Sequence, residues 1–345
     1  MGLFVRTRTA SGQSNVPVWF MRQAGRYHSH YQEIKKNSDF MTMCKNPQLA
    51  CDVTMGPIDC FHFDAAILFS DLLFPLEQMG LGLVYDPGPK LAKNIHTLDD
   101  VKNLKMLDSA RNFYKFQGQA VDLLRKKLPE DKTLLGFVGA PFTLYAYAVE
   151  GGHSGSLISS KQGFYDGRWA AFTERLLPEL FQEMLVQAES GADAICLFDT
   201  AAGELTYNDY KEYVLPVLRK ITSQFKKSFP QKKIIYYSKF THINYLQAIE
   251  DENIDVLGID WRVSIKDALD TLGSDYMIQG NLDPAHLHLP WPLLEKKWEQ
   301  LWSEVKLSKH SADRWIAGLG HGVLQQTPEE NVFNSVKWVH EHCIY

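Results

Sequence analysis

Short runs of apolar, β-branched and aromatic residues recur along the chain, and most of them stop at a polar residue or a glycine. Runs of this length and composition are typical of buried β-strands. They are spread over the whole chain. Eight such runs are found, at residues 16–21, 65–69, 134–138, 194–198, 234–237, 256–259, 276–278 and 315–319.

Segments with apolar residues at helical spacing lie between most of these runs, for example 168–189, 207–226 and 327–340. Eight strands that alternate with helices predict an α/β protein, here a single (β/α)₈ TIM barrel over residues 1–345. In such a barrel, the polar residues at the carboxyl ends of the strands meet on one rim, where the chemistry takes place.

The early predicted strands are followed by long intervals, so we expect insertions after the early strands, around residues 76–98 and 150–167. A two-domain α/β protein is the alternative. No linker-like stretch divides the chain, and the glycine-rich segment 151–156 is interpreted as a lid or loop at the rim rather than as a boundary.

Charge is distributed unevenly along the chain. The net charge of −5 argues weakly against nucleic acid as the main partner. The first 50 residues hold seven basic and two acidic residues, a balance of +5, so the other 295 residues carry −10. This basic opening suggests a local anion site. Arg6 and Arg8 fit better in a solvated, flexible arm over residues 1–14, whereas Arg22 and Arg26 close an apolar run.

The cysteines and the apolar runs indicate where in the cell the protein is found. The five cysteines are odd in number and form no CxxC pair, which fits reduced thiols better than a disulfide framework. The N-terminus lacks the apolar core of a signal peptide. No run approaches the roughly 20 apolar residues that a membrane span needs. We therefore expect a soluble, cytoplasmic protein with no membrane partner.

Two arginines, Arg22 and Arg26, stand four residues apart around Gln23, Ala24 and Gly25. Gly25 permits a positive φ or a close backbone approach, and exposed amides nearby can bind an anion. Two guanidinium groups can each bind a carboxylate in bidentate fashion. The spacing alone allows equally well two surface arginines that pair with helix acids.

Asp71 follows the second apolar run after one residue, Ser70, so its side chain is expected at the mouth of a strand. The apolar residues 72–74 would give the carboxylate a partly dry setting. For an arbitrary aspartate, a helix cap or a structural ion pair is the more common role. Asp199 and Asp260 follow other strands and carry the same ambiguity.

His321 lies between two glycines at the end of the last predicted strand, where a histidine is structural about as often as it binds a ligand. Tyr147 lies at helical spacing beyond the third strand, which by itself favours a core position. His286 and His288, like the terminal cluster 340–343, lack the complementary pair of a zinc signature, so no metal site is expected. No P-loop and no GxGxxG follows a strand, so no nucleotide cofactor is indicated.

Longer motifs carry a family resemblance. Residues 17–27, PVWFMRQAGRY, resemble the N-terminal signature of the uroporphyrinogen decarboxylase family. Residues 136–144, GFVGAPFTL, with Tyr147 and the following EGG, resemble its second signature. The resemblance covers residues 16 to about 330 in family order. Further matches lie at 65–71, 198–203, 258–261, 279–284 and 320–322.

The resemblance implies a single (β/α)₈ barrel domain, usually a homodimer, which needs no metal or organic cofactor. It implies a carboxy-lyase that removes the four acetate carboxylates of uroporphyrinogen III as CO₂ and gives coproporphyrinogen III in heme biosynthesis. Asp71, as transition-state stabiliser, and Arg22 are the implied catalytic residues. The substrate contacts that it carries over are Arg22, Gln23, Ala24, Gly25, Arg26, Asp71, Tyr147, Thr200 and His321.

The chemistry of this substrate suits those residues. Arginines and a histidine at a rim can bind and steer a molecule with eight carboxylates. Four pyrrole N–H groups can converge on one acceptor such as Asp71. Protonation of a pyrrole carbon creates a cationic ring, which the fixed carboxylate would stabilise. Arg22 is placed to deliver the proton, but a guanidinium with a pKa above about 12 is a poor acid, so a water or another acid is the alternative.

The chain departs from the family pattern in three places. Residues 28–32, His-Ser-His-Tyr-Gln, replace a segment that usually reads Leu-Pro-Glu-Tyr-Arg. Phe240 stands where a glycine often follows Lys239, and Gly318 stands where an asparagine is frequent. None of these replaces a predicted contact. The first change is expected to alter the pH dependence, because histidines titrate near neutrality.

Two rival functions are considered beside this one. Zinc-dependent corrinoid methyltransferases of the same superfamily need a His-x-Cys pair near the fifth strand, where residues 236–240 read Tyr-Tyr-Ser-Lys-Phe and supply no such ligand. A porphyrin-binding paralogue with altered catalysis is the other. The retention of Asp71, Arg22 and Arg26 argues against it.

Overall fold

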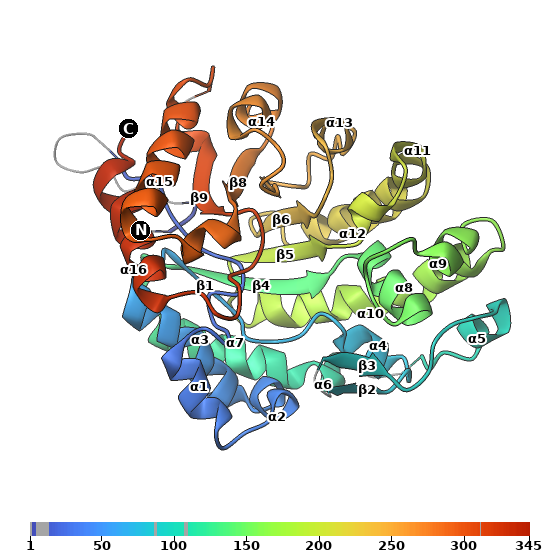
Figure 1. The fold of residues 1–345 in the computed structure, drawn as a ribbon. Coiled ribbons are helices and arrows are strands. Elements are labelled where there is room, and N and C mark those ends of the chain that lie inside the picture. Colours follow the sequence, from blue (N-terminus) through green and yellow to red (C-terminus); the bar gives the residue numbers. More distant parts are fainter. Residues whose placement is uncertain (1, 5–13, 86–87, 107–109, 311) are drawn as a thin grey trace.

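Seven parallel strands form one curled sheet at the centre of the computed structural model (Figure 1). They pair in the order β1-β4-β5-β6-β7-β8-β9, with helices between consecutive strands, so both faces of most strands are covered. The structure describes residues 2–4, 14–85, 88–106, 110–310 and 312–345. The strands are β1 (Ala65–Ile67), β4 (Thr133–Gly139), β5 (Ala194–Asp199), β6 (Lys233–Ser238), β7 (Val256–Gly258), β8 (Met277–Leu282) and β9 (Trp315–Leu319).

The predicted α/β class is confirmed, and seven of the eight predicted runs form this sheet. The first run, 16–21, holds only an isolated parallel bridge, between Val18 and Ala317. Pro17 has no N–H to donate, and the Val18 N–H donates to Oδ2 of Asp64 at 2.8 Å instead of to a backbone carbonyl. A regular ladder therefore does not form, and the sheet has seven strands in the described chain where eight were expected.

The predicted helices are present, with differences at their ends. The segment 168–189 coincides with α10 (Arg168–Glu189). The segment 207–226 is divided into α11 (Tyr207–Asp209), the π-turn η2 (Tyr210–Val214) and α12 (Leu215–Ser228), because Pro216 cannot donate a helical hydrogen bond. The last predicted helix is α16 (Glu329–His342). The remaining helices are α1 (Ser29–Lys35), α2 (Phe40–Lys45), α3 (Pro47–Phe61), α4 (Phe74–Gln78), α5 (Leu98–Lys102), α6 (Ala110–Phe113), α7 (Lys115–Lys127), α8 (Pro141–Glu150), α9 (Ile158–Gln162), η1 (Ala202–Glu204), α13 (Ile243–Gln247), α14 (Ile265–Leu272), η3 (Pro284–His288), α15 (Trp291–Lys306) and η4 (Ala312–Arg314).

Both predicted insertions are found after the early strands. The first contains the antiparallel hairpin of β2 (Leu83–Tyr85) and β3 (Pro89–Leu91), and the second contains α9. In Figure 1 both insertions lie at the carboxyl ends of the strands, opposite the end where the chain termini meet. The insertions therefore stand beside the rim on which a barrel enzyme carries its site.

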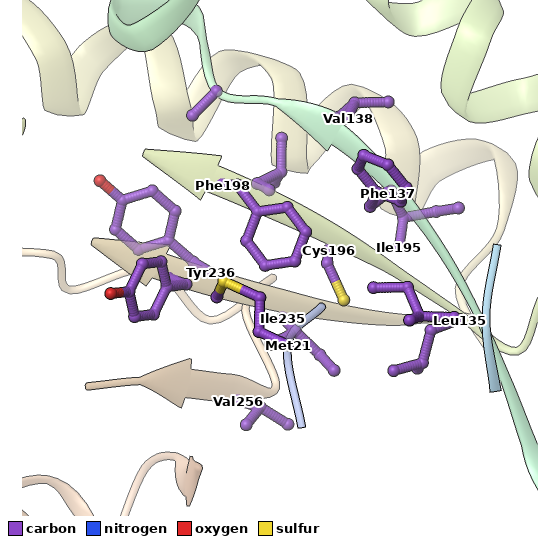
Figure 2. Packing of buried hydrophobic residues seen from close by; sticks show 14 of the residues in the cluster. Met21, Leu135, Phe137, Val138, Ile195, Cys196, Phe198, Ile235, Tyr236 and Val256 are labelled. Carbon is purple, nitrogen blue, oxygen red and sulfur yellow. The ribbon is translucent and has the colours of Figure 1, made fainter. Parts of the chain in front are cut away.

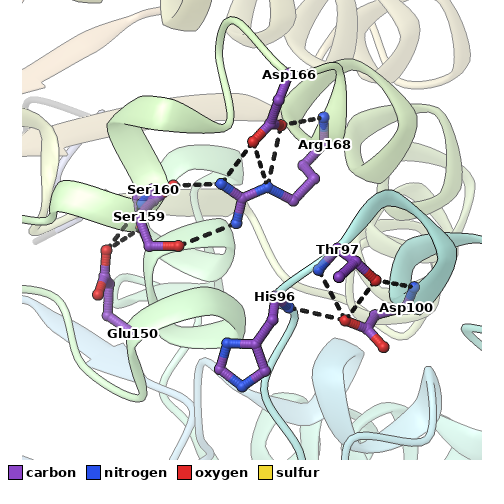
Figure 3. A network of polar contacts seen from close by, with 8 residues as sticks. All are labelled: His96, Thr97, Asp100, Glu150, Ser159, Ser160, Asp166 and Arg168. Carbon is purple, nitrogen blue, oxygen red and sulfur yellow. Dashed lines mark hydrogen bonds and ion pairs between the residues drawn. The ribbon is translucent and has the colours of Figure 1, made fainter.

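A buried arginine fixes the second insertion (Figure 3). Arg168 is 4% exposed, and its Nε donates to both oxygens of Asp166 at 3.0 and 2.8 Å. Its two terminal nitrogens donate to the hydroxyl and the carbonyl of Ser159 at 3.0 and 2.9 Å. Glu150 accepts from the Ser160 N–H at 2.8 Å. These bonds hold both ends of the glycine-rich loop between α8 and α9.

Apolar side chains of neighbouring strands fill the inside of the curled sheet. Figure 2 shows Met21, from the segment that bridges to β9, among Cys196 of β5, Ile235 of β6 and Val256 of β7. All four side chains are buried. The N-terminal segment thus supplies part of the interior just before the chain turns at Arg22.

The predicted flexible arm, 1–14, falls largely on residue 1 and residues 5–13, which lie outside the described residues. The described part contacts the rest of the protein. Leu3 is fully buried. Ser14 and Tyr345 exchange two backbone hydrogen bonds, each of 3.0 Å. These described residues are therefore held by the fold.

Candidate active site

Arg22 lies in a tight turn at the rim, directly after the segment that bridges to β9. Its φ of 59° is in the left-handed region, which costs a non-glycine residue conformational energy. Gly322, on the loop after β9, makes room for it, because a Cβ at that position would lie 2.4 Å from Cδ of Arg22. The arginine itself is exposed. The charge of Arg22 acts on the pKa of both Asp71 and His321, which follow the first and last strands of the sheet.

Residues 23–26, the rest of the predicted motif, are either buried parts of the turn or lie nearer the surface. Gln23 is 1% exposed, and its side-chain amide donates to the carbonyl of Ala65 at 2.9 Å. This bond ties the turn to β1. The backbone N–H and carbonyl of Gln23 are also hydrogen-bonded within the turn, so the whole residue is a structural part of it. Ala24 and Gly25 are half-buried, and Arg26 is exposed.

Asp71 is half-buried and follows β1. Its Oδ1 accepts from the Leu73 N–H at 2.8 Å, and its Oδ2 accepts from the hydroxyl of Tyr85 on the β2–β3 hairpin. Burial raises the pKa of Asp71, while the bonds from Tyr85 and Leu73 and the charge of Arg22 oppose that rise. The carboxylate is thus desolvated, fixed in orientation and close to a guanidinium.

Tyr147 on α8 and His153 in the following loop lie together at this rim, with ring centroids 5.3 Å apart. Burial first, and then the charge of Asp71, raises the pKa of Tyr147 to about 12. Burial and the charge of Lys239 lower the pKa of His153. Helical spacing alone favoured a core position for Tyr147, but the structure leaves this side chain half-buried and within the electrostatic reach of Asp71.

Thr200 follows β5 and is 9% exposed, and its buried hydroxyl has no hydrogen-bond partner in the described part of the chain. Asp199 differs, because its two oxygens accept from the hydroxyls of Thr143 at 2.7 Å and Tyr236 at 2.9 Å. Burial raises the pKa of Asp199 to about 6. Asp199 is therefore a structural hub, whereas the Thr200 hydroxyl keeps its hydrogen-bonding capacity.

His321 follows β9 and stacks on Tyr237, with ring centroids 5.9 Å apart. The Tyr237 hydroxyl donates to the carbonyl of Gly320 at 2.8 Å and lies 3.2 Å from Nδ1 of His321. Since that hydroxyl has one proton, Nδ1 must donate to it. Burial first, then Arg22 and Lys239, lowers the pKa of His321 to about 3. The imidazole is therefore neutral and presents Nε2 as an acceptor.

Four rim residues were not assigned to the site from the sequence: Tyr85, His153, Lys239 and Arg262. Lys239 directly follows β6, and burial, Arg262 and Arg22 lower its pKa. Lys239 and Arg262 follow strand ends as Asp71 does, so the strand-end pattern was the signal that could have found them. Tyr85 carried no such signal, because its position depends on how the inserted hairpin folds back.

No group of three or more His, Cys, Asp or Glu side chains is arranged to hold a metal ion within the described ranges. His340, in the terminal cluster, lies 2.8 Å from Oδ2 of Asp64 and thus contacts the same carboxylate that holds Val18. None of the helices that the structure describes combines the length and the apolar character of a membrane span.

Comparison with known proteins extends these observations. The family model described as uroporphyrinogen decarboxylase matches residues 2–342. A protein named uroporphyrinogen decarboxylase from Trichlorobacter lovleyi is 37% identical over 94% of both chains. One from Geobacter sp. (strain M21) is 38% identical, also over 94% of both chains.

Among solved structures, a methyltransferase from Methanosarcina mazei has a TM-score of 0.74 at 16% identity, over 95% of this chain and 94% of its own. A B12-independent methionine synthase from Shewanella has a TM-score of 0.57 at 10% identity, over 95% and 97%. At these identities the two likenesses concern the fold alone. The match over almost the whole length of the sequence decides the family: this chain belongs to the uroporphyrinogen decarboxylase family.

Proposed function

We propose that this protein removes the four acetate carboxylates of uroporphyrinogen III as CO₂ and forms coproporphyrinogen III in tetrapyrrole biosynthesis. One observation carries the proposal beyond the family match. The desolvated carboxylate of Asp71 lies within the electrostatic reach of Arg22 and Tyr147, on a rim that also carries Lys239 and His321. That arrangement suits a substrate with a ring of N–H donors at its centre and carboxylates around its edge.

Asp71 is proposed to accept the pyrrole N–H groups and to stabilise positive charge on the ring. A proton adds to a pyrrole carbon, and the ring becomes an iminium-like cation. The bond from the acetate methylene to its carboxylate then breaks, CO₂ leaves, and the electron pair flows into the ring. A proton at the methylene gives the methyl group while the ring proton is lost. Each cycle thus consumes one proton and releases one CO₂, and the preorganised anion lowers the barrier.

The carboxylates of the substrate are proposed to bind to the surrounding residues. The guanidinium groups of Arg22 and Arg26 are exposed, and the hydroxyls of Tyr147 and Thr200 are suited to hydrogen bonding. Ala24 and Gly25 would contribute through their backbone, and Gln23 would position the turn that carries them. His321 is neutral without ligand, and a carboxylate beside it would raise its pKa. Arg22 is a proposed carboxylate contact, and a water or another acid is the proposed proton donor.

The finer architecture is proposed with the function. The segment around Val18 contacts β9 through two backbone bonds to Ala317, and its carbonyl accepts from the Asp64 N–H at 2.9 Å, just before β1. These bonds support a role for the segment as the eighth, irregular element that closes a single (β/α)₈ barrel domain. A homodimer without metal or organic cofactor is proposed from the family resemblance. A cytoplasmic location and the lack of a nucleic-acid partner are proposed from the cysteine pattern and the net charge.

One assay tests the proposal. Purified protein, treated with a chelator, is incubated anaerobically with uroporphyrinogen III, and the products are oxidised and separated by chromatography. Successive appearance of seven-, six-, five- and four-carboxylate porphyrins is expected. Binding without products would favour the altered paralogue, and activity only with zinc and a methyl donor would favour the methyltransferase. Either result would overturn the proposed reaction.

A further inference from the structure

Phe240 is a bulky residue in a backbone conformation that suits glycine. It follows β6 with a φ of 62°, at a position where the family pattern often has glycine. Its N–H donates to Oδ2 of Asp260 at 2.6 Å, which fixes the turn. Gly203 lies against the same turn, since a Cβ there would lie 2.3 Å from the carbonyl oxygen of Lys239. A strained aromatic residue in a fixed turn suggests a compensating gain elsewhere.

The ring of Phe240 holds two cations. Nζ of Lys239 lies 4.2 Å from the ring centroid, and Cζ of Arg262 lies 4.0 Å from the same centroid. The Arg262 guanidinium also lies 4.4 Å from the ring centroid of Trp261. Distances of this size are within the range of cation–π attraction. The phenyl ring thus attracts both a lysine and an arginine, although their positive charges repel each other.

Lys239 and Arg262 have few acidic partners that could balance their positive charges. Arg262 shares Asp260, whose Oδ2 lies 3.3 Å from its guanidinium and already accepts from the Phe240 N–H. Lys239 makes no ion pair within 4.0 Å in the part of the chain that the structure describes. Burial, Arg262 and Arg22 lower the pKa of Lys239, and they outweigh the opposing charges of Asp260 and Glu204. A bound anion would relieve this unbalanced charge.

The paired cations adjoin the residues proposed to bind substrate. The charge of Lys239 acts on the pKa of His153 and of His321. The pKa of Tyr237, whose hydroxyl lies against His321, is affected in turn by Arg22 and Arg262. The pair therefore extends the cationic rim along the carboxyl ends of β6 and β7 rather than forming a separate surface patch.

We propose that Lys239 and Arg262, held by the ring of Phe240, form a two-point carboxylate subsite that binds one carboxylate side chain of the polycarboxylate substrate. Phe240 is the positioning residue of this subsite. The identity of the substrate rests on the proposed function, whereas the binding of a multiply carboxylated tetrapyrrole does not depend on decarboxylation. The chain's departure from glycine at this position is then a feature of substrate binding.

The decisive variant is Phe240→Gly, because glycine adopts a positive φ without strain and the fold should be kept or stabilised. The probe is uroporphyrin, the oxidised octacarboxylate, which binds without reacting and is followed by its fluorescence. We expect Phe240→Gly to raise the Kd about 5- to 10-fold, as cation–π attraction and lost orientation would give. With uroporphyrinogen as substrate, KM should rise by a similar factor and kcat should change less.

Matched variants distinguish the effect of the aromatic ring on binding from the effects of side-chain size and of overall charge. Phe240→Leu keeps a large apolar side chain at the strained turn but removes the aromatic face, so it should weaken binding as Phe240→Gly does. Lys239→Gln should weaken binding further and reduce the salt dependence of the Kd. Lys296→Gln, on the exposed surface of α15, removes one charge away from the rim and should leave the Kd unchanged.

The outcomes distinguish this inference from the proposed function. Unchanged Kd and KM in folded Phe240→Gly and Lys239→Gln would overturn the subsite. Failure of the wild-type protein to bind uroporphyrin would overturn it as well. If the wild type binds uroporphyrin without decarboxylating uroporphyrinogen, and the variants weaken that binding, the subsite stands and the proposed reaction falls.

Discussion

Tyr85, on an inserted hairpin, donates a hydrogen bond to Oδ2 of Asp71, the carboxylate that follows β1. The second carboxylate oxygen is held by the Leu73 N–H, so both oxygens have a donor before any ligand arrives. Burial works in the other direction and raises the pKa of Asp71. The hairpin therefore orients the proposed catalytic carboxylate and helps to keep it ionised.

Replacement of Tyr85 by Phe should shift the acidic limb of the pH–rate profile to higher pH. The hydroxyl is the largest influence that lowers the pKa of Asp71, so its loss raises that pKa. The ionised form is the proposed active one, and activity would be lost at a higher pH as the medium is acidified. The measurement is kcat against pH for both proteins. An identical acidic limb, with Tyr85→Phe folded, would contradict this role.

Replacement of Asp71 by Asn should remove catalysis much more than binding. Loss of one preorganised electrostatic group at a reacting centre typically reduces kcat by about 100- to 1,000-fold. The Kd for uroporphyrin should change by far less, because carboxylate contacts around the rim persist. Asp71→Ala should act in the same way. The surface variant Asp122→Asn on α7 is the control, and near-normal turnover of Asp71→Asn would remove Asp71 from the mechanism.

Replacement of Thr200 by Val should raise KM without loss of stability. The Thr200 hydroxyl is buried with no described partner, so an apolar group of similar shape removes a desolvated donor and should leave the melting temperature unchanged or higher. If the hydroxyl contacts substrate, KM should rise about 5-fold, the effect of a hydrogen bond worth about 1 kcal/mol.

Thr143→Val is the matched comparison for Thr200. The Thr143 hydroxyl donates to Asp199 at 2.7 Å and accepts from the Ala201 N–H at 3.1 Å. Its removal leaves buried groups unpaired, which should cost about 1–3 kcal/mol of unfolding free energy. Thermal unfolding of both variants tests the contrast, and a destabilised Thr200→Val with unchanged KM would contradict it.

His28 should make the protein less stable in mild acid. This histidine, in a segment that departs from the family pattern, is fully buried, and neither ring nitrogen has a described hydrogen-bond partner. Burial lowers its pKa, Glu329 at 3.9 Å opposes this effect, and His30 adds to it. The unfolded chain, with a pKa of about 6.5, therefore binds a proton that the folded protein excludes. The free energy of unfolding therefore decreases as the pH falls below about 6.5, by at most about 1.4 kcal/mol per pH unit.

Urea unfolding at pH 7.5 and pH 5.5 measures this effect. His28→Leu should show a smaller drop in unfolding free energy between the two conditions than the wild type. His96→Leu, on an exposed histidine, should keep the wild-type drop. An equal drop in wild type and His28→Leu would show that the acid sensitivity has another source.

Much of the fold could be read from the sequence, because apolar runs of strand length and helical spacing reflect local geometry that tertiary packing only reinforces. The strand that ends at Leu319 and the helix Arg168–Glu189 were predicted with their observed bounds. The first predicted strand was not formed, because the Val18 N–H is bonded to a side chain, Asp64, 46 residues away. A hydrogen bond between residues so far apart along the chain leaves no periodic pattern in the sequence.

The sequence by itself determined which residues stand at the carboxyl ends of the parallel strands, since order along the chain fixes that rim. It thereby placed Asp71 and His321 at the rim, and the family resemblance added Thr200 as a site candidate. Only the tertiary structure decided that Tyr85 holds Asp71 and that Phe240 holds two cations. Hydrogen bonds, desolvation and cation–π contacts depend on distances between segments that the chain brings together only when it folds.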